Sequence, residues 1–600
     1  MKHYLLTLAT LALLASCSSN ESAEAVQEDA QEFIDSYTTR WMELSYTAAK
    51  ADWKANTYIV DGDTATSNAV TRAYETLAGF TGSEENINKA QKLLKKRDKL
   101  TVLQAKQLDA ILYQAAANPQ TVKDLVAEKI KADNDQNNAL FGFKFTIGAD
   151  TVSTNDIDRI LNKENDLAKR LAAWESSKEV GKVLKDGLEN LQRLRNKTVQ
   201  ALGYDDYFTY QVSDYGMTTE EMMALMLKIN RELRPLFREL HTWTRYELAK
   251  RYNQPVPDLI PAHWLPNRWG QDWSGLVEVE GIDLDGVIEA KGAEWITEQA
   301  ERFYISLGFD AMPKSFYELS DLYPLPQGAA YSKNNHASAW HLDYENDVRS
   351  LMSVEANTEW YETVHHELGH IYYYMAYTNP DVPALLRNGA NRAYHEAIGT
   401  QMGLAAMQKP FLEGLGLIPA GTETDEMQTL LKEALNYAVF IPFSTGTMTS
   451  FEHDLYVENL PKDQYNNRWW DYVAKYQGIA PASPRGEEFC DAASKTHISN
   501  DAAQYYDYAI SFVLLFQLHD HIAKKILKQN PRSTNYYGNE EVGKFIHSIL
   551  SKGATVDGWE LLQKIVGSEL SAQPMLDYFA PLMTWLKEQN QGREHTLPKL

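Results

Sequence analysis

The segment TEWYETVHHELGHIYYYMAYTNP, residues 358–380, guides the interpretation of the whole chain. Asn357 or Thr358 can cap the start of a helix here, because their side-chain oxygens can accept from backbone N–H groups of the first turn. Glu359 would then lie in that first turn, and Asn379-Pro380 supplies a stop. The segment therefore predicts a helix that carries the motif His-Glu-Leu-Gly-His.

This motif indicates a metal site. Residues four apart lie within ~40° of each other on a helix, so His366 and His370 can reach one cation, with the Glu367 carboxylate close enough to take a proton from a metal-bound water. A zinc site of this kind needs a third protein ligand. The segment GANRAYHEAIGTQMGLAAM, residues 389–407, offers Glu396, 30 residues after His366, which leaves room for the chain to reverse. We predict one zinc ion on His366, His370 and Glu396.

Two further histidines stand next to these ligands in sequence. Asn391 can cap the second helix, and His395 directly precedes Glu396, as His365 precedes His366. One residue is about 100° round a helix, so neither His365 nor His395 should share the metal. We expect both to support a ligand or to pack in the core.

Helical patterning dominates the rest of the chain. Apolar residues recur at helical spacing in residues 93–117 and 217–252, and residues 505–527 form an apolar run, interrupted by polar residues, that predicts a buried helix. The best strand signals are residues 141–147 and 329–354. No repeat, low-complexity tract or evident linker divides the chain, so we expect one large, mainly α-helical catalytic unit.

The composition restricts the partners of the protein. A net charge of −24 and a pI near 5.1 disfavour binding to phosphate backbones or anionic lipid headgroups, so no nucleic-acid partner is expected. With 600 residues, of which 44% are hydrophobic, the chain can bury a large core.

The N-terminal residues MKHYLLTLATLALLASC, 1–17, indicate export. A basic start at Lys2 precedes an apolar run that is too short to span ~30 Å of hydrocarbon. The sequence Leu-Ala-Ser-Cys at 14–17 resembles the bacterial lipobox, which implies cleavage before Cys17 and acylation of that residue. Its only possible disulfide partner would be Cys490, so the fold should need no internal disulfide.

These features predict three regions. Residues 1–16 would be a lipoprotein signal peptide, residues 17–26 the acylated cysteine and a short tether, and residues 27–600 a single catalytic domain. The protein would then be exported and held in the cell envelope by its lipid, facing the periplasm or in the outer membrane. Without the lipid it would be periplasmic or secreted.

Several separated motifs together resemble the angiotensin-converting-enzyme family of zinc dipeptidyl carboxypeptidases. They occur in the family's order over nearly all of the mature chain, from Ala51-Asp52-Trp53 to LDYFAPLMTWL. They are PAHWLPNRWGQDW, HASAW at 336–340, HHELGHIYY, GAN followed by HEAIG, FIPFS at 440–444, WW followed by KYQG, PxSPR, and KTHI at 495–498.

The resemblance implies a mainly α-helical fold, with two lobes that enclose a deep cleft and zinc at its bottom. It implies zinc on His366, His370 and Glu396, with Glu367 as general base and then general acid. His497 and Tyr508 would stabilise the oxyanion, and His497 could also act in proton transfer.

The resemblance also implies how the substrate is held. Gln271, Lys495 and Tyr505 would grip its C-terminal carboxylate, while His336 and the backbone at Ala337 would hold the peptide beside the scissile bond. A cation two residues beyond that bond turns a general peptidase into one that releases dipeptides. The expected substrates are therefore oligopeptides with a free C-terminus.

Two departures from the family pattern predict differences. Thr400 stands where the family usually has an aspartate one turn beyond the glutamate ligand, so a neutral hydroxyl replaces a charged partner. Family members commonly bind chloride through two arginines, and the matching positions here are Asp507 and Val473. We therefore expect that chloride is not required for activity.

Two other functions remain open at this point. A thimet-type endo-oligopeptidase shares an HExGH helix and an all-helical cleft, although the three carboxylate-binding residues favour an exopeptidase. An inactive zinc-dependent receptor or peptide-binding lipoprotein is the alternative from another class. The presence of Glu367 argues against it, because a binding protein needs no base beside its metal.

Overall fold

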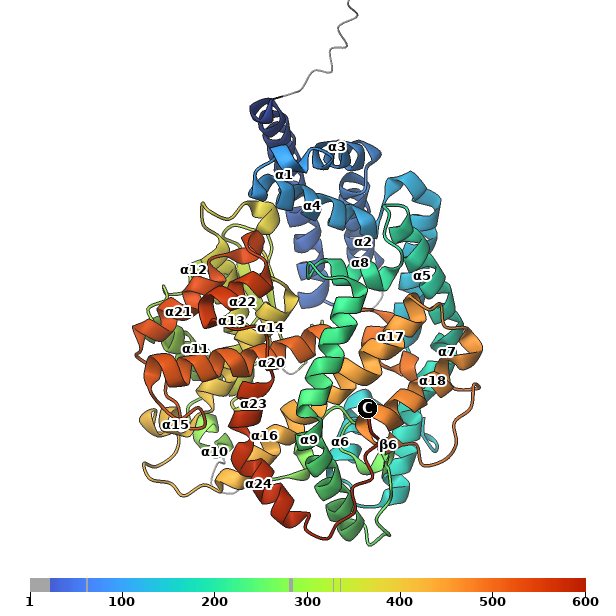
Figure 1. Ribbon diagram of the computed structural model, residues 1–600, viewed down its shortest axis with the longest axis vertical. Coiled ribbons are helices and arrows are strands. Elements are labelled where there is room, and N and C mark those ends of the chain that lie inside the picture. Colours follow the sequence, from blue (N-terminus) through green and yellow to red (C-terminus); the bar gives the residue numbers. More distant parts are fainter. Residues whose placement is uncertain (1–21, 61–62, 280–283, 327, 335) are drawn as a thin grey trace, which may run out of the picture.

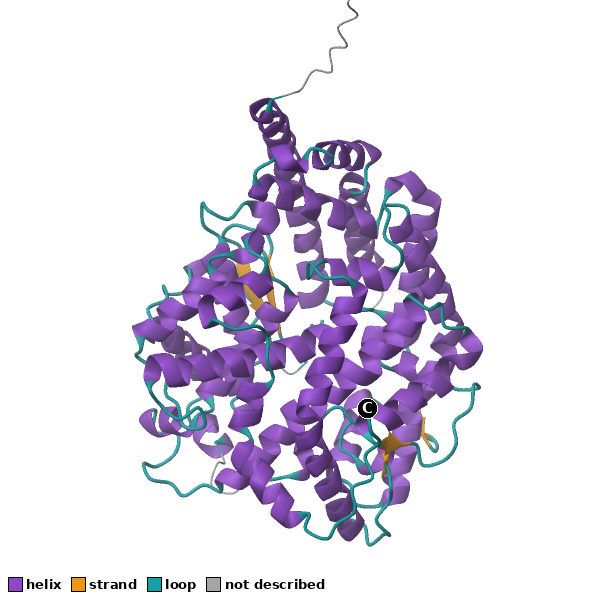
Figure 2. Ribbon diagram, viewed as in Figure 1, coloured by secondary structure: helices purple, strands orange, loops and turns teal. Residues whose placement is uncertain are grey.

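The computed structural model describes residues 22–60, 63–279, 284–326, 328–334 and 336–600. Helices make up most of these residues and the strands are few and short (Figures 1 and 2). The prediction of a mainly α-helical fold is therefore confirmed.

Within the described residues the α-helices follow one another along the chain, joined by loops, turns and short helices of other types. The first twelve are α1 (Ala23–Thr57), α2 (Thr64–Thr81), α3 (Glu84–Leu94), α4 (Val102–Ala117), α5 (Lys123–Phe141), α6 (Thr154–Lys163), α7 (Leu167–Gln200), α8 (Tyr207–Ser213), α9 (Thr219–Arg251), α10 (Asp285–Glu289), α11 (Ala293–Ser306) and α12 (Lys314–Leu319). The next twelve are α13 (Thr358–Tyr377), α14 (Arg392–Ala406), α15 (Lys409–Gly414), α16 (Glu426–Ile441), α17 (Thr449–Tyr456), α18 (Tyr465–Tyr472), α19 (Thr496–Ser499), α20 (Tyr506–His521), α21 (Glu540–Leu550), α22 (Gly558–Val566), α23 (Gln573–Tyr578) and α24 (Ala580–Gln589).

The described strands form three sheets of two strands each. Antiparallel pairs join β1 (Phe145–Ile147) to β2 (Asp150–Val152) and β4 (Ser338–His341) to β5 (Val348–Leu351), and β3 (Ile260–Pro261) runs parallel to β6 (Ile479–Ala480). Strands β1, β4 and β5 fall within the two regions where the sequence indicated strands.

The first described helix begins earlier than the sequence suggested. Ser22 caps α1 by accepting from the Ala25 N–H over 3.2 Å, so the helix includes Ala23 and precedes the expected start at Gln27 by four residues. A serine at this position satisfies one of the N–H groups left without a partner at a helix start. The predicted signal peptide and Cys17 lie outside the described residues.

The centre of the fold is built around α20, which packs against α14 and α23 (Figure 1). Its apolar side chains are almost all buried, as the sequence indicated. The polar residues inside it have partners: Gln517 Nε2 donates to Ser568 Oγ over 2.9 Å, and His519 Nδ1 lies 2.6 Å from Tyr536 Oη. Buried polar groups are tolerated when they are paired in this way. Within the described residues, no helix combines the length and the hydropathy that crossing a bilayer requires.

Candidate functional site

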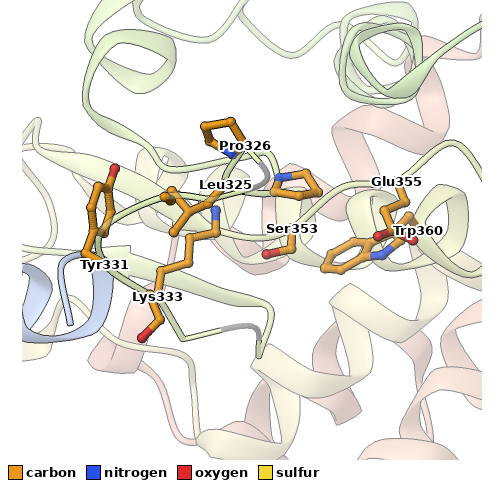
Figure 3. A pocket seen from close by; sticks show the side chains of 10 residues that line it. Leu325, Pro326, Tyr331, Lys333, Ser353, Glu355 and Trp360 are labelled. Atoms are coloured by element: carbon orange, nitrogen blue, oxygen red, sulfur yellow. The ribbon is translucent and has the colours of Figure 1, made fainter. Parts of the chain in front are cut away.

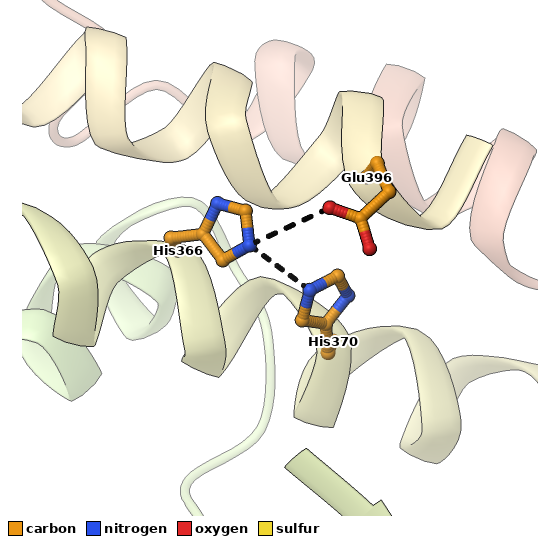
Figure 4. A group of neighbouring side chains, drawn as sticks. All are labelled: His366, His370 and Glu396. Atoms are coloured by element: carbon orange, nitrogen blue, oxygen red, sulfur yellow. Dashed lines mark hydrogen bonds and ion pairs between the residues drawn. The ribbon is translucent and has the colours of Figure 1, made fainter. Parts of the chain in front are cut away.

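Helix α13 carries the motif and begins at the predicted place. The Asn357 side chain accepts from the Trp360 N–H over 2.9 Å, which fixes the first turn, and the helix ends at Tyr377, before Asn379-Pro380. His366 and His370 are one turn apart on this helix. Their rings therefore point from the same face (Figure 4).

Helix α14 packs along α13 and brings Glu396 to the two histidines. His366 Nε2 lies 3.1 Å from His370 Nε2 and 4.0 Å from Glu396 Oε2. One ligand atom from each of the three residues lies within 4.8 Å of the other two, and Figure 4 shows the three side chains turned toward a common point. The three residues selected from the sequence are thus brought together as one possible metal-binding group.

Two glycines allow this close packing of helices. A Cβ atom added to Gly369 of α13 would stand 2.9 Å from Gly399 Cα in α14. A Cβ atom added to Gly399 would stand 3.0 Å from the His366 ring. Any larger residue at either position would push α14 from α13, so both glycines set where Glu396 meets the histidines.

The second ring nitrogens of the two histidines face neighbouring side chains. Thr400 Oγ1 lies 3.4 Å from His366 Nδ1, and His395 Nδ1 lies 3.3 Å from His370 Nδ1. Such contacts fix the orientation of a ligand imidazole. His365 is fully buried, with Nδ1 2.7 Å from the Tyr361 carbonyl oxygen, and His365 and His395 both lie outside the three-residue group.

Burial changes the pKa values of the titratable groups at this site. It lowers the pKa of His366 to about 4, assisted by the nearby His370, so the ring is neutral at pH 7 and can offer a lone pair. Burial also lowers the pKa of His370. In contrast, burial and then the negative charge of Glu396 raise the pKa of Glu367 to about 8. A carboxylate with a raised pKa is a stronger base.

A second polar group gathers Gln271, Lys495 and Tyr505 from three distant segments. Lys495 Nζ donates to Gln271 Oε1 over 2.9 Å, and Tyr505 Oη donates to the same oxygen over 3.2 Å. The ammonium lies 4.5 Å from the centre of the Trp269 ring and 5.1 Å from that of Tyr505. Burial, and then the charge of Arg268, lower the pKa of Lys495 to about 7. A cation held among rings without an acidic partner is suited to receive a carboxylate.

His497 and Tyr508 lie against this second group. His497 Nε2 is 3.4 Å from Tyr508 Oη, and the ring of Tyr505 lies 4.8 Å from the ring of His497 and 5.0 Å from that of Tyr508. Burial and the charge of Lys495 lower the pKa of His497, and burial raises the pKa of Tyr508 to about 12. The imidazole is thus neutral and the phenol keeps its proton.

Among the described residues, strand β4 pairs with another strand along one edge only, and its other edge is here called the open edge. Leu342 N–H donates to the Asp347 carbonyl oxygen on the β5 side, and hydrogen-bonded pairs alternate along an antiparallel ladder. The backbone groups of His341 and Ala339 therefore point away from β5, and Ala337 continues this pattern. On this side the Ala339 carbonyl oxygen accepts from Tyr374 Oη of α13 over 3.2 Å and keeps its second lone pair. The Ala337 carbonyl oxygen lies 2.7 Å from Nδ1 of the exposed His336.

The comparison with protein families gives the match that decides the assignment. Residues 24–598 match the family model described as "Angiotensin-converting enzyme". The chain belongs to the angiotensin-converting enzyme family.

Curated relatives support this assignment along different lengths of the chain. The chain is 27% identical to the angiotensin-converting enzyme of Theromyzon tessulatum over 95% of its own length and 94% of that protein. It is 32% identical to the angiotensin-converting enzyme of Mesocricetus auratus, over 74% of this chain and 34% of the longer relative. It is 30% identical to the angiotensin-converting enzyme-related protein of Drosophila melanogaster, over 73% of each chain.

Membership makes the chain a zinc metallopeptidase of the peptidyl-dipeptidase class. The family is zinc dependent, and the group of His366, His370 and Glu396 has the donor set of a catalytic zinc site, two imidazoles and one carboxylate. The match also supports the angiotensin-converting-enzyme resemblance over the thimet-type alternative.

One feature of this angiotensin-converting-enzyme family member was missed by the sequence analysis. Arg392, one turn before Glu396 on α14, binds Asp501 through two hydrogen bonds of 3.1 and 2.7 Å, and its Nε lies 3.3 Å from Asp507 Oδ2. Tyr215 Oη donates to the other oxygen of Asp507 over 2.5 Å. The sequence offered one indication of its role: Arg392 lies one turn before the ligand Glu396, on the same face of the helix.

The surroundings of Asp507 also affect its protonation. Burial raises its pKa to about 8 although Arg392 acts to lower it, since Asp501 already neutralises that guanidinium. Val473, at the other position matched to a family arginine, is buried in the core. The cation near Asp507 is thus already bound to carboxyl groups of the chain itself.

Proposed function

We propose that this enzyme releases dipeptides from the free C-terminus of oligopeptides. The observation that supports this is the direct contact between the carboxylate-binding and oxyanion-binding groups: the Tyr505 ring lies against both His497 and Tyr508. A substrate whose carboxylate sits at Lys495 would therefore have a peptide carbonyl close to the oxyanion residues. The distance between the carboxylate-binding and the oxyanion-binding residues would then set the length of the released fragment.

His366, His370 and Glu396 are proposed to hold one zinc ion per chain. Their fit rests on chemistry that the described residues provide: two neutral imidazole nitrogens 3.1 Å apart and a carboxylate on the adjacent helix. When bound there, zinc supplies a Lewis acid and lowers the pKa of a coordinated water.

Glu367 is proposed to move the proton. As general base it takes a proton from the attacking water, and as general acid it then delivers that proton to the nitrogen of the leaving amine. Its raised pKa of about 8 suits both steps near neutral pH. Burial excludes competing water from this carboxyl group.

His497 and Tyr508 are proposed to stabilise the negative charge that develops on the carbonyl oxygen. Tyr508 keeps its proton at neutral pH and a neutral His497 ring carries one N–H, so each can donate a hydrogen bond. Donors that meet charge only in the transition state contribute ~10²–10³ in kcat each. His497 could also relay a proton.

Gln271, Lys495 and Tyr505 are proposed to bind the substrate carboxylate, while His336 and the backbone at Ala337 hold the peptide beside the scissile bond. The open edge of β4 supports the second role, since an extended peptide can add to such an edge by backbone hydrogen bonds. Oligopeptides are the expected partners, and the acidic surface disfavours nucleic acids.

We further propose that activity does not require chloride. An anion site needs a cation that the protein has not already neutralised, and Arg392 is bound by Asp501 and lies beside Asp507. The resemblance places the other family arginine at Val473, which carries no charge.

The proposed location is the cell envelope, with the chain anchored through an acylated Cys17 after export and otherwise without membrane contact. The support is the sequence alone: the signal segment of residues 1–16 and the lipobox before Cys17. Intact-mass measurement of the protein from membranes, beside a Cys17→Ser variant, tests it. An unmodified Cys17 would disprove the anchor and leave the enzymatic proposal untouched.

The activity is tested with paired peptides that differ only in a free-acid or amidated C-terminus. Mass spectrometry should show dipeptides leaving the free acid one after another, and little cleavage of the amide. Equal internal cleavage of both would indicate an endo-oligopeptidase. Zinc binding without turnover of any peptide would indicate the inactive binding protein instead.

A further inference from the structure

A large cavity lies beneath the N-terminal helices, at the end of β4. Its volume is about 690 Å³, within the range of sites that bind small ligands. Residues of α1, α2, α4, α5 and α8 line it together with the turn that follows β4, and α1, α2 and α4 pack together at one end of the molecule (Figure 1).

The walls of this cavity are rich in rings. The aromatic lining residues are Trp41, Tyr74, Tyr113, Tyr210, His341 and Tyr344. On α1, the small residues Ser45, Ala48 and Ala49 leave the space open between them. Such walls match a planar aromatic side chain, which gains stacking or edge contacts as well as burial.

The polar groups of the lining narrow the class of ligand. Gln114 Oε1 is buried and accepts no hydrogen bond within the described structure, so it is available to an N–H donor. Glu75 is the only acidic residue in the lining, which contains no lysine or arginine. An aromatic group with an N–H nearby fits this chemistry, whereas a carboxylate does not.

The geometry of β4 connects this cavity with the proposed substrate. Tyr374, one turn beyond His370 on α13, donates to the Ala339 carbonyl oxygen over 3.2 Å, and His341 Nδ1 lies 3.2 Å from Tyr377 Oη further along the same helix. The His341 end of β4 is therefore directed away from the metal-binding histidines, and the His336 end, whose charge acts on His497, lies toward the oxyanion residues. His341, at the other end, lines the cavity. A peptide with its C-terminus at Lys495 that pairs with the open edge therefore runs antiparallel to β4, with its N-terminal part directed to the cavity.

The length of the strand sets the position of the residue that enters. Ala337, proposed to lie beside the scissile bond, and His341 are four residues apart, about 13 Å at ~3.3 Å per residue. A residue opposite His341 is then about four positions N-terminal to the cleaved bond. Peptides of three residues are too short to reach it.

We propose that this cavity, named here the upstream pocket, binds an aromatic side chain of the substrate about four residues N-terminal to the cleaved bond. The proposal rests on the proposed peptidyl-dipeptidase function and adds a preference for longer peptides with tryptophan, tyrosine or phenylalanine at that position. It assigns the N-terminal helices a role in substrate selection.

Another cavity of about 550 Å³ does not offer a comparable site (Figure 3). It is lined by Lys333, whose ammonium already donates to Asp321 Oδ1, the Tyr323 carbonyl and the Met352 carbonyl over 2.5 to 2.7 Å. All three donors of this cation are therefore used within the fold.

The test uses a series of eight-residue free-acid peptides with one tryptophan moved through positions two to six upstream of the cleaved bond in an alanine background. We expect kcat/KM for release of the first dipeptide to rise about tenfold with tryptophan near the fourth position. Aspartate at the same position should lower it. A flat profile across all positions would overturn the proposal.

Variants that fill the upstream pocket provide a second test of the proposal. Ala49→Trp on α1 and Thr71→Trp at the exposed rim should each remove the preference for tryptophan, while an N-acylated tripeptide is cleaved as by the wild type. Thr76→Trp, exposed on α2 outside the lining, is the matched control and should keep the preference.

The outcomes separate the two proposals. If Ala49→Trp does not fold, Thr71→Trp decides the matter, because its side chain lies at the surface. Retention of the tryptophan preference in a folded Thr71→Trp variant would overturn the upstream pocket. Failure of the wild-type enzyme to release a dipeptide from the acylated tripeptide would instead overturn the proposed function.

Discussion

Lys495 Nζ donates to Gln271 Oε1 over 2.9 Å although 224 residues separate the two in sequence. The rings of Trp269 and Tyr505 surround the same ammonium. The fold thus buries a cation beside an amide, a phenol and an indole, and among its described contacts no carboxylate pairs with it. The C-terminus of a substrate would supply the missing anion.

Removing this cation should weaken binding of peptides that end in a free carboxylate. We expect Lys495→Ala to cost ~2–5 kcal/mol with a free-acid substrate, because the carboxylate would be buried without its charge partner, and to have little effect with the amidated analogue. Steady-state kinetics on both peptides measure the difference. Lys182→Ala, which removes a surface lysine paired with Glu179, is the control. Equal losses on both peptides would mean that Lys495 serves the fold.

The lowered pKa of Lys495 predicts a pH dependence. Below pH ~7 the ammonium is charged and ready for the substrate, while above it the neutral amine must take up a proton when a carboxylate binds. kcat/KM for free-acid peptides should therefore fall as pH rises through about 7, by at most tenfold per unit. Lys495→Arg keeps its charge throughout this range, so the decline due to this group should disappear. An unchanged profile in Lys495→Arg would contradict the assignment.

Glu367→Gln tests the proposed base. Glutamine preserves the shape of the side chain but cannot accept the proton, so kcat should drop by ~10²–10⁴ while bound zinc, measured by elemental analysis, stays at one per chain. Glu359→Gln in the first turn of the same helix should behave as the wild type. Near-normal turnover in a pure Glu367→Gln preparation would show that another group moves the proton.

Chloride should leave the rate unchanged. Arg392 is already bound by Asp501 and approached by Asp507, so an added anion has no cation to join there. kcat/KM measured from chloride-free buffer to saturating chloride, with acetate holding the ionic strength constant, checks this. A saturable, several-fold increase specific to chloride would be the opposite result.

Asp507 should also make stability depend on pH. Its folded pKa of about 8 lies above the unfolded value near 3.9, so the native state binds more protons between these limits. Stability from this group is then full below pH ~4 and is lost as pH rises through 8, with a slope of at most ~1.4 kcal/mol per unit. The Asp507→Asn variant should not lose this stability as the pH rises, because asparagine does not titrate in this range.

Denaturant unfolding of both proteins at pH 5, 7 and 9 gives the comparison. The Asp507→Asn variant should gain in stability relative to the wild type as the pH increases. Tyr394→Phe, which removes a buried hydroxyl of α14 that donates to the Gly558 carbonyl oxygen, provides a control with no such trend. A relative stability that is constant with pH would show that Asp507 is ionised throughout.

The sequence predicted which three residues come together as a possible metal-binding group, because the information for them is local. His366 and His370 are fixed by the helical repeat, and Glu396 follows after one helix end and one reversal of the chain. The helical repeat also predicted the buried α20 and α13, for which the sequence left Asn357 and Thr358 as possible caps and the structure selects Asn357. The start of α1 was placed late because Ser22 lies in a polar stretch whose capping role is seen only in the structure.

Other parts of the site depend on contacts between distant segments. Gln271, Lys495 and Tyr505 could be selected only through the family resemblance, since no local pattern links them. Arg392 was missed for the same physical reason: its partner Asp501 lies 109 residues away. The upstream pocket arises from five helices and a strand end, so no single stretch of sequence contains its outline.

The polar residues of α20 have a consequence for the passage of an exported chain through the translocation channel. An apolar segment that is long enough can leave the channel sideways and remain in the lipid, and polar or charged side chains oppose this step. Asp507 near one end of α20 and Gln517 and His519 near the other interrupt its apolar run, and each has a partner in the folded enzyme. In a chain exported as proposed, the side chains that anchor α20 in the folded enzyme would thus also favour release of this segment on the far side of the membrane.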